Sequence, residues 1–179
     1  GADVIGRMHA ELSKWAGNFD FGAKYAKEPR PHTTSTRSDT LPNAVVFDID
    51  GTLALMGDRS PFDWARVGVD LPNQPVIERA RDHYEHSGDE VILVSGRDGS
   101  CEAETRAWLA KHGVPFDALY MRPAGDYRKD TQIKKEIYDA HISGKFNVLA
   151  VYDDRPSVVD MWNGLGLFVF NCQQGRYEF

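Results

Sequence analysis

The segment AVVFDIDGT, residues 44–52, decides the fold of this chain. Its first four residues are apolar and predict a buried strand, and Gly51 allows the chain to turn. Asp48 and Asp50 follow the strand two residues apart, so an extended backbone would place both carboxylates on the same side. Two carboxylates so close repel each other unless a cation or a proton lies between them. The pattern therefore indicates metal-assisted phosphoryl transfer, with one nucleophilic carboxylate and one that moves protons.

Strands and helices alternate from residue 44 onward. The expected strands lie at residues 44–47, 90–94, 116–121, 147–152 and 167–170, and the expected helices at about 73–87, 102–112, 131–142 and 156–163. A run of such βα units predicts an α/β fold, a three-layer sandwich around a mostly parallel five-stranded sheet. The segment between Asp50 and the next helix is too short for a large lid domain, so we expect a small or absent cap and an open site.

Polar residues follow three of the predicted strands. Asp48 and Asp50 follow the first, Ser95-Gly96-Arg97 follow the second, and Asp153-Asp154-Arg155 follow the fourth. Because the carboxyl ends of parallel strands meet at one edge of a sheet, these groups should lie together, with Lys134 from a nearby helix.

Four of these residues are candidates for catalysis. Asp48 would attack phosphorus, and Asp50 would protonate the leaving oxygen and then activate water. Ser95 would donate a hydrogen bond to a phosphate oxygen, and Lys134 would neutralise the phosphoryl charge. Taken singly, such aspartates more often cap turns and such a lysine more often lies on a solvated face. The combination favours the catalytic interpretation.

Converging carboxylates require a cation, and Mg²⁺ prefers oxygen ligands. The predicted metal ligands are Asp48, Asp50, Asp153 and Asp154. Arg59 and Arg97 are candidates for bidentate phosphate contacts, and Asp130 could orient basic side chains. The alternative for Asp153 and Asp154 is a surface acidic pair or a helix cap before Pro156.

Composition limits the class of protein. The net charge of −6 argues against a broad surface that coats nucleic acid, although a few arginines could still bind a phosphate locally. Two cysteines are too few for a disulfide framework, so we expect two reduced thiols. The chain has no apolar stretch of transmembrane length and no signal-peptide core at its N-terminus, which predicts a cytoplasmic protein with no membrane partner.

The chain divides near residue 43. Residues 3–16 have helical apolar spacing, and residues 28–42 have the composition of a linker. We therefore expect an N-terminal helix and linker at 1–43 and a catalytic domain at 44–179. The apolar stripe of the helix needs a partner, either another domain or another copy of the chain.

The motifs resemble those of haloacid dehalogenase-like (HAD) phosphohydrolases over about residues 44–171. These motifs are Asp-x-Asp-Gly-Thr at 48–52, Ser95, Lys134 and the acidic pair at 153–154. The second aspartate, Asp50, implies phosphatase rather than dehalogenase chemistry.

Residues 46–54, 57–63, 94–97, 128–137 and 153–162 are further similar to the 3′-phosphatase domain of bacteriophage polynucleotide kinase/phosphatases. This resemblance implies that Asp48 is the nucleophile, that Asp50 is the acid/base, and that Asp153 and Asp154 serve Mg²⁺. It also implies that Arg59, Arg97, Asp130 and Lys134 assist at the phosphate. The N-terminal helix would be the end of a truncated kinase domain, and a phage protein would act in the cytoplasm of its bacterial host.

The sequence therefore predicts a Mg²⁺-dependent polynucleotide 3′-phosphatase that acts in nucleic-acid end repair through an aspartyl-phosphate. DNA and RNA 3′-phosphate ends both stay open as substrates, as does activity on cyclic phosphates. One alternative is a phosphatase of small phosphomonoesters such as nucleotides, and another is a non-catalytic phosphate-binding module. An upstream kinase domain and a homo-oligomer both remain as partners for the N-terminal helix.

Overall fold

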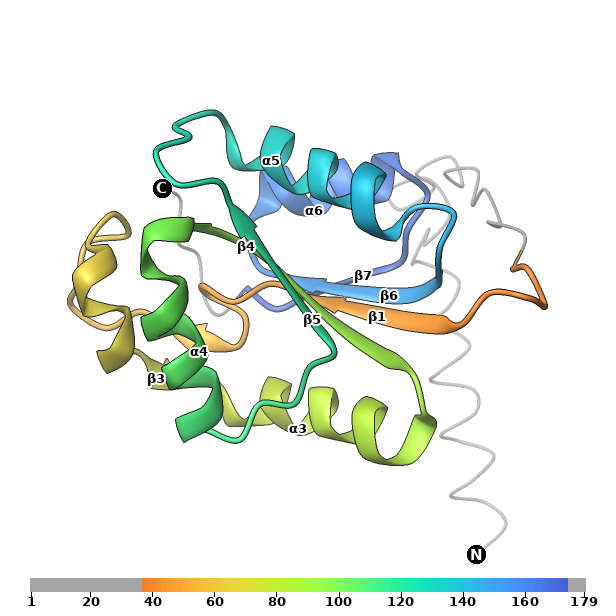
Figure 1. Cartoon of the computed structure of the whole chain (residues 1–179), viewed down its shortest axis with the longest axis horizontal. Helices are drawn as coiled ribbons and strands as arrows, with labels where there is room; N and C mark the ends of the chain where they lie inside the picture. The colour runs from red at the N-terminus through yellow and green to blue at the C-terminus, as the bar shows by residue number, and fades with distance from the viewer. Residues whose placement is uncertain (1–36, 174–179) are drawn as a thin grey trace, which may run out of the picture. The chain divides into compact units, whose positions relative to one another are not determined.

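A five-stranded parallel sheet forms the centre of the domain (Figure 1). The computed structural model describes residues 37–173, and all of these belong to one compact unit. The predicted helix at 3–16 and most of the predicted linker lie outside the described residues. The division of the chain near residue 43 therefore stays a prediction.

The strands of the sheet follow the order β5-β4-β1-β6-β7, and every neighbouring pair is parallel. They are β1 (Asn43–Phe47), β4 (Glu90–Asp98), β5 (Ala118–Arg122), β6 (Asn147–Asp153) and β7 (Val169–Asn171). The predicted number and succession of strands is confirmed. Strand β4 continues past the expected end at residue 94, so that Ser95 and Arg97 lie in the strand itself rather than after it.

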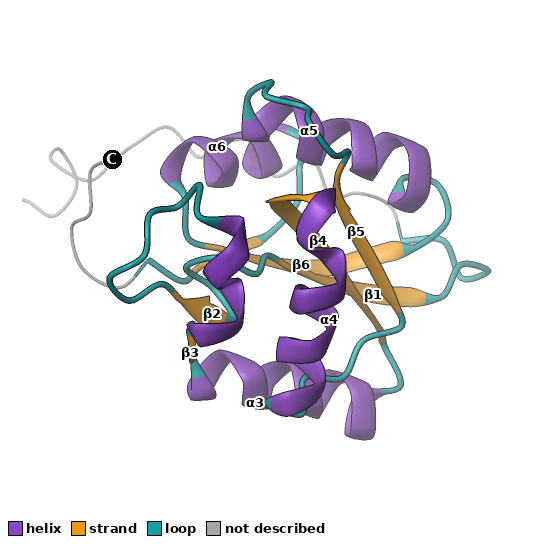
Figure 2. Ribbon diagram, turned by 60° about the vertical axis from the view of Figure 1, so that its left-hand side comes forward, coloured by secondary structure: helices purple, strands orange, loops and turns teal. Residues whose placement is uncertain are grey.

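Helices cover both faces of the sheet, as expected for a three-layer sandwich (Figure 2). They are α3 (Gln74–Asp82), α4 (Glu102–Lys111), α5 (Asp130–Ile137) and α6 (Pro156–Gly164). Helices α3 and α5 each continue into a π-helical turn, at His83–Ser87 and Tyr138–Ile142. In both views α3 and α4 lie on one side of the sheet, and α5 and α6 on the other.

The central position of β1 in the sheet explains why residues 44–47 are all apolar instead of alternating between apolar and polar. Val45 and Phe47 pack in a core cluster with residues of α3 and α4. Ala44 and Val46 pack in a second cluster with residues of α5 and α6. Because β1 has strands on both sides and helices on both faces, all four side chains are buried, as is usual for parallel sheets.

A small insertion separates β1 from α3. It contains the two-residue strands β2 (Ala54–Leu55) and β3 (Leu71–Pro72), which pair antiparallel, and a 3₁₀ helix at Trp64–Val69. We call residues 54–72 the flap. None of its elements was predicted, because strands of two residues are too short to produce a periodic pattern. The flap agrees with the expected small cap.

Two further expectations can be compared with the described residues. Cys101 and Cys172 are both free thiols, as predicted. Among the helices of residues 37–173, none has the length and apolar character needed to cross a membrane.

Candidate active site

Asp48 lies where β1 ends, and its position is fixed by the sheet. Its backbone N–H donates to the carbonyl of Tyr152 at 2.9 Å, which continues the pairing with β6. The side chain is only 5% exposed and accepts a hydrogen bond from Lys134 Nζ at 2.7 Å. Lys134 comes from α5, is itself 1% exposed, and also donates to Asp153 Oδ2 at 2.8 Å. The lysine therefore bridges carboxylates at the ends of two neighbouring strands, β1 and β6.

Asp48, Asp153 and Asp154 form a group in which one carboxylate oxygen of each lies within 4.8 Å of the others. Trp162 Nε1 donates to Asp153 Oδ2 at 3.1 Å, and Thr52 Oγ1 to Asp154 Oδ1 at 3.5 Å. The convergence predicted from the strand ends is confirmed for these three aspartates and Lys134. We call Asp48, Asp153 and Asp154 the carboxylate group.

The carboxylate group holds more negative charge than Lys134 offsets. Burial raises the pKa of Asp48 well above its usual value, and Asp153 and Asp154 add to this, while Lys134 opposes it. Burial and then Asp153 raise the pKa of Asp154 to about 6. Burial would lower the pKa of Lys134, but Asp153, Asp48 and Asp130 outweigh it and raise that pKa well above normal. The lysine therefore stays charged, and its single charge is shared by several carboxylates.

The residues present fit a Mg²⁺ ion. The carboxylate group offers hard oxygen donors, the ligand type that Mg²⁺ prefers. The raised pKa values of Asp48 and Asp154 agree with a site that a further positive charge would stabilise. Gly51 preserves this arrangement. Its φ is +84°, and a Cβ atom at this position would collide with the Asp154 carboxylate. The glycine after the two aspartates is therefore needed both for the turn and for the close approach of Asp154.

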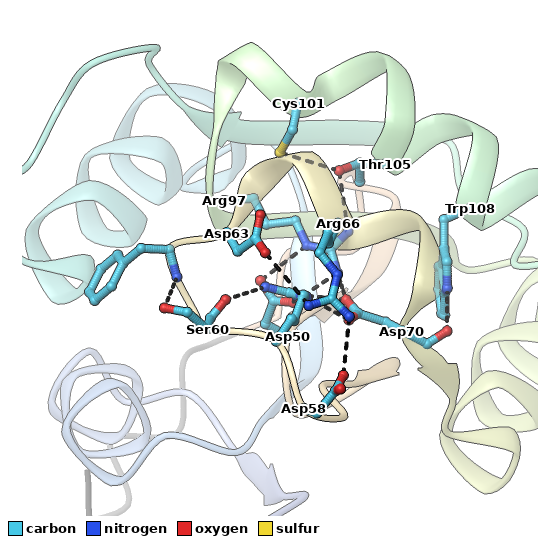
Figure 3. A network of polar contacts seen from close by, with 12 residues as sticks. Asp50, Asp58, Ser60, Asp63, Arg66, Asp70, Arg97, Cys101, Thr105 and Trp108 are labelled. Atoms are coloured by element: carbon cyan, nitrogen blue, oxygen red, sulfur yellow. Dashed lines mark hydrogen bonds and ion pairs between the residues drawn. The ribbon is translucent and has the colours of Figure 1, made fainter.

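Asp50 has different partners from Asp48, although only Ile49 separates them. Asp50 Oδ1 accepts hydrogen bonds from Arg59 Nη2 and Arg97 Nη2, both at 2.8 Å, and Oδ2 accepts from Arg97 Nε at 3.0 Å (Figure 3). Asp50 therefore meets positive charge from two arginines, whereas Asp48 meets it from Lys134. Two guanidinium groups neutralise Asp50, and its side chain lies outside the carboxylate group that could hold a metal. Ligation of the metal by Asp50 stays a prediction.

Asp70 is the residue that the sequence analysis missed. It lies at the end of the flap with its side chain fully buried, and it accepts from Arg59 Nε at 2.6 Å and from the Nη2 atoms of Arg59 and Arg97 at 2.7 Å. Its backbone carbonyl accepts from Trp108 Nε1 at 2.8 Å. The sequence offered only a weak signal, an aspartate among the apolar residues of the segment VGVDL at 67–71.

Arg59, Arg97, Asp50 and Asp70 make a closed network of two positive and two negative side chains. Both guanidinium groups are fully buried, and Arg97 Nη1 also donates to Thr105 Oγ1 at 3.2 Å. A buried guanidinium that meets two carboxylates fixes their orientation more than it attracts a ligand. The structure therefore places the two arginines where they hold Asp50, and their direct contact with a phosphate stays a prediction.

Asp130, the first residue of α5, lies among basic side chains, as the sequence analysis expected. Its carboxylate is 3.4 Å from Arg122 Nη2, 3.7 Å from Lys134 Nζ and 3.6 Å from Arg155 Nη1. Gly96 makes this possible, because a Cβ there would collide with the Asp130 carboxylate.

Ser95 lies in β4, two residues beyond Leu93, which pairs with the last residue of β1, and it is fully buried. Its Oγ accepts from the backbone N–H of Arg97 at 3.2 Å, which leaves the hydroxyl hydrogen available to donate. The predicted hydrogen bond from Ser95 to a phosphate oxygen remains untested.

Known proteins resemble this chain over most of its length. A family model described as the polynucleotide kinase PNKP phosphatase domain matches residues 42–177. A protein of Autographa californica nuclear polyhedrosis virus, named "Putative bifunctional polynucleotide kinase/RNA ligase", is 40% identical over 145 residues, or 79% of this chain and 21% of that protein.

Two solved structures resemble the chain. A structure of the Pnkp1/Rnl/Hen1 complex has a TM-score of 0.77 and 40% identity, covering 81% of this chain and 50% of the other. A structure of the Pnkp1/Rnl/Hen1 RNA repair complex has a TM-score of 0.80 and 36% identity, covering 98% of this chain and 57% of the other. The chain thus spans about a fifth of the viral relative and about half of each structural relative.

Proposed function

Because the chain belongs to the polynucleotide kinase PNKP phosphatase-domain family, we propose that it is a Mg²⁺-dependent phosphatase that removes terminal 3′-phosphates from DNA or RNA. One observation carries the proposal. Asp48 lies in a carboxylate group bridged by Lys134, whereas Asp50 is held separately by Arg59 and Arg97. Two adjacent carboxylates with such different surroundings can take two different roles in the same reaction.

The reaction proceeds in two steps. In the first, an Asp48 carboxylate oxygen attacks phosphorus, the bond from phosphorus to the 3′-oxygen breaks, and Asp50 transfers a proton to that oxygen. The nucleic acid leaves with a free 3′-hydroxyl, and the phosphoryl group remains on Asp48. In the second step Asp50 takes a proton from water, the water oxygen attacks phosphorus, and Asp48 and inorganic phosphate separate.

Several side chains support these steps by position and charge. Lys134 orients Asp48 and supplies a fixed positive charge beside the phosphoryl oxygens. Arg59 and Arg97, held in turn by Asp70, keep Asp50 in one orientation for both proton transfers. Asp48, Asp153 and Asp154 would hold Mg²⁺, which supplies electrostatic stabilisation of the phosphoryl charge.

The small flap supports a polymeric substrate. The insertion between β1 and α3 is limited to residues 54–72, so the described residues contain no large cap that would enclose a small metabolite. One relative is named as a polynucleotide kinase/RNA ligase and another belongs to an RNA repair complex. We therefore propose that the substrate is a nucleic-acid end and that the domain works beside kinase and ligase activities.

Phosphate release from matched oligonucleotides tests this proposal. Oligonucleotides of one sequence, as DNA and as RNA, would carry either a 3′-phosphate or a 5′-phosphate and would be compared with a 3′-mononucleotide. We expect release from the 3′-phosphate oligonucleotides in Mg²⁺, and none from the 5′-phosphate oligonucleotides or in excess chelator. A strong preference for the mononucleotide would indicate a small-molecule phosphatase. No release from any phosphomonoester, including p-nitrophenyl phosphate, would indicate a binding module.

A further inference from the structure

Tyr127 is the most exposed large hydrophobic side chain among the described residues, at 93%. It lies in the loop between β5 and α5, residues 123–129, at the carboxyl end of β5, the end of the sheet at which the active site is built (Figure 1). Burying an aromatic ring of this size would be favourable, so full exposure has no benefit for the stability of the isolated domain. The ring is therefore available to a ligand.

The backbone that carries Tyr127 is nevertheless firmly held. Arg122 Nη1 donates to the carbonyls of Asp126 and Arg128, which flank the tyrosine, at 2.9 Å and 2.6 Å. The N–H of Gly125 donates to Asp98 Oδ2 at 2.8 Å. A ring on a fixed backbone loses little conformational freedom when a ligand covers it, which favours binding.

The positive charge of Arg128, the residue after Tyr127, is already neutralised. Arg128 Nη2 donates to Asp126 Oδ2 at 2.7 Å, and Arg128 Nη1 donates to Glu136 Oε1 at 2.6 Å. Further hydrogen bonds to the same two carboxylates come from Arg128 Nε and Nη2. Because two carboxylates surround this guanidinium, Arg128 is not free to bind a phosphate beside Tyr127. At residue 127 itself the loop presents an exposed aromatic ring.

Arg122 also ties the loop to the active site. Besides the loop carbonyls, its guanidinium donates to the carbonyl of Gly96 at 2.7 Å and lies 3.4 Å from Asp130 Oδ1. Asp130 is an ion-pair neighbour of Lys134, which holds Asp48. Arg122 therefore connects the backbone on both sides of Tyr127, through Asp130 and Lys134, to the nucleophile.

We propose that Tyr127 is a stacking platform for a nucleobase close to the 3′ end of the substrate. The inference rests on the proposed function and goes beyond it by naming the part of the substrate that is recognised. Every nucleobase has a π face, so stacking adds affinity without a sequence requirement. A ring that acts only in binding affects KM and leaves kcat unchanged. A protein partner could also use an exposed tyrosine, but the link through Arg122 and Asp130 to the nucleophile favours the substrate.

The test compares Tyr127→Ala, Tyr127→Phe and the control Phe168→Ala. Phe168 is 61% exposed and lies at the amino end of β7, the opposite edge of the sheet. Each protein would be assayed with a 3′-phosphate oligonucleotide, with the same oligonucleotide abasic at its last two positions, and with p-nitrophenyl phosphate. Binding of the fluorescein-labelled intact oligonucleotide would be followed by anisotropy.

We expect Tyr127→Ala to raise KM, and the Kd from anisotropy, about tenfold on the intact oligonucleotide with kcat unchanged. Tyr127→Phe and Phe168→Ala should behave as wild type. On the abasic oligonucleotide and on p-nitrophenyl phosphate, Tyr127→Ala should equal wild type. An unchanged KM and Kd for Tyr127→Ala on the intact oligonucleotide, or an equal rise on the abasic one, would overturn stacking and indicate a protein contact instead. If wild type releases no 3′-phosphate, the proposed function fails, and the anisotropy comparison alone still decides for or against stacking.

Discussion

Replacing Asp70 with asparagine would weaken the hold that Arg59 and Arg97 have on Asp50. Asp70 is fully buried and accepts three hydrogen bonds from Arg59 and Arg97, whose guanidinium groups are also fully buried. Asparagine keeps the shape but removes the charge, so two buried guanidinium groups would share the single carboxylate of Asp50. The NH₂ group of asparagine would also face the guanidinium groups, which can only donate hydrogen bonds and so cannot accept one from it.

The size of the expected stability loss follows from the burial of these side chains. Removing one partner of a buried ion pair costs about 3–5 kcal/mol, because the remaining charge is uncompensated. For a chain of this size each kcal/mol lowers the melting temperature by roughly 2–4 °C, so we expect a fall of about 6–20 °C. Asp50 should also lose its fixed orientation, so kcat should fall in the fraction that remains folded.

Asp58→Asn is the matched control in the same flap. Asp58 is 90% exposed and lies 3.2 Å from Arg66, which is 49% exposed. Exposed pairs of this kind contribute less than about 1 kcal/mol. Thermal unfolding and kcat would be measured for wild type and both variants. If Asp70→Asn unfolds within a degree or two of Asp58→Asn and retains wild-type kcat, the assignment of Asp70 as the support of Arg59, Arg97 and Asp50 is refuted.

Two further predictions concern the carboxylate group. Because the folded chain raises the pKa of Asp154 from 3.8 to about 6, the folded state binds a proton more tightly than the unfolded state, and the metal-free protein should gain stability as pH falls from about 7 to 5. The same proton competes with Mg²⁺, so titrating the melting temperature with Mg²⁺ should give an affinity about tenfold weaker at pH 5 than at pH 7, and equal affinities would contradict the argument. Gly51→Ala should abolish Mg²⁺-dependent stabilisation and activity, because φ is +84° and its Cβ would displace the Asp154 carboxylate. Gly57→Ala, where nothing lies within 4 Å of an added Cβ, is the control, and a Gly51→Ala protein with normal Mg²⁺ stabilisation would disprove the need for glycine.

Much of the fold could be predicted from residues 44–52 and the alternation that follows them. An apolar run without alternation requires a strand covered on both faces, and β1 is the central strand. Parallel connections then bring Asp48, Lys134, Asp153 and Asp154 to one edge, so their convergence follows from topology alone.

The sequence could not show which charged residues pair with one another. Arg59 and Arg97 have the chemistry to bind a phosphate, and only the packing of the flap reveals that Asp50 and Asp70 already occupy their donors. Asp70 follows a 3₁₀ helix and precedes a strand of two residues, so no periodic pattern marked it. Pairing across a short irregular insertion depends on tertiary contacts, which spacing in the sequence does not encode.

The central claim is that Asp48 carries the phosphoryl group from a nucleic-acid 3′ end. Its most direct test is a rapid acid quench of the enzyme with an oligonucleotide labelled with ³²P in its 3′-phosphate, followed by peptide mapping. We predict transient radioactivity, labile to hydroxylamine, on the peptide that contains Asp48, and none with Asp48→Asn, which should fold but lack activity. Release of labelled phosphate in a single turnover without any labelled protein, or full activity of Asp48→Asn, would contradict the account.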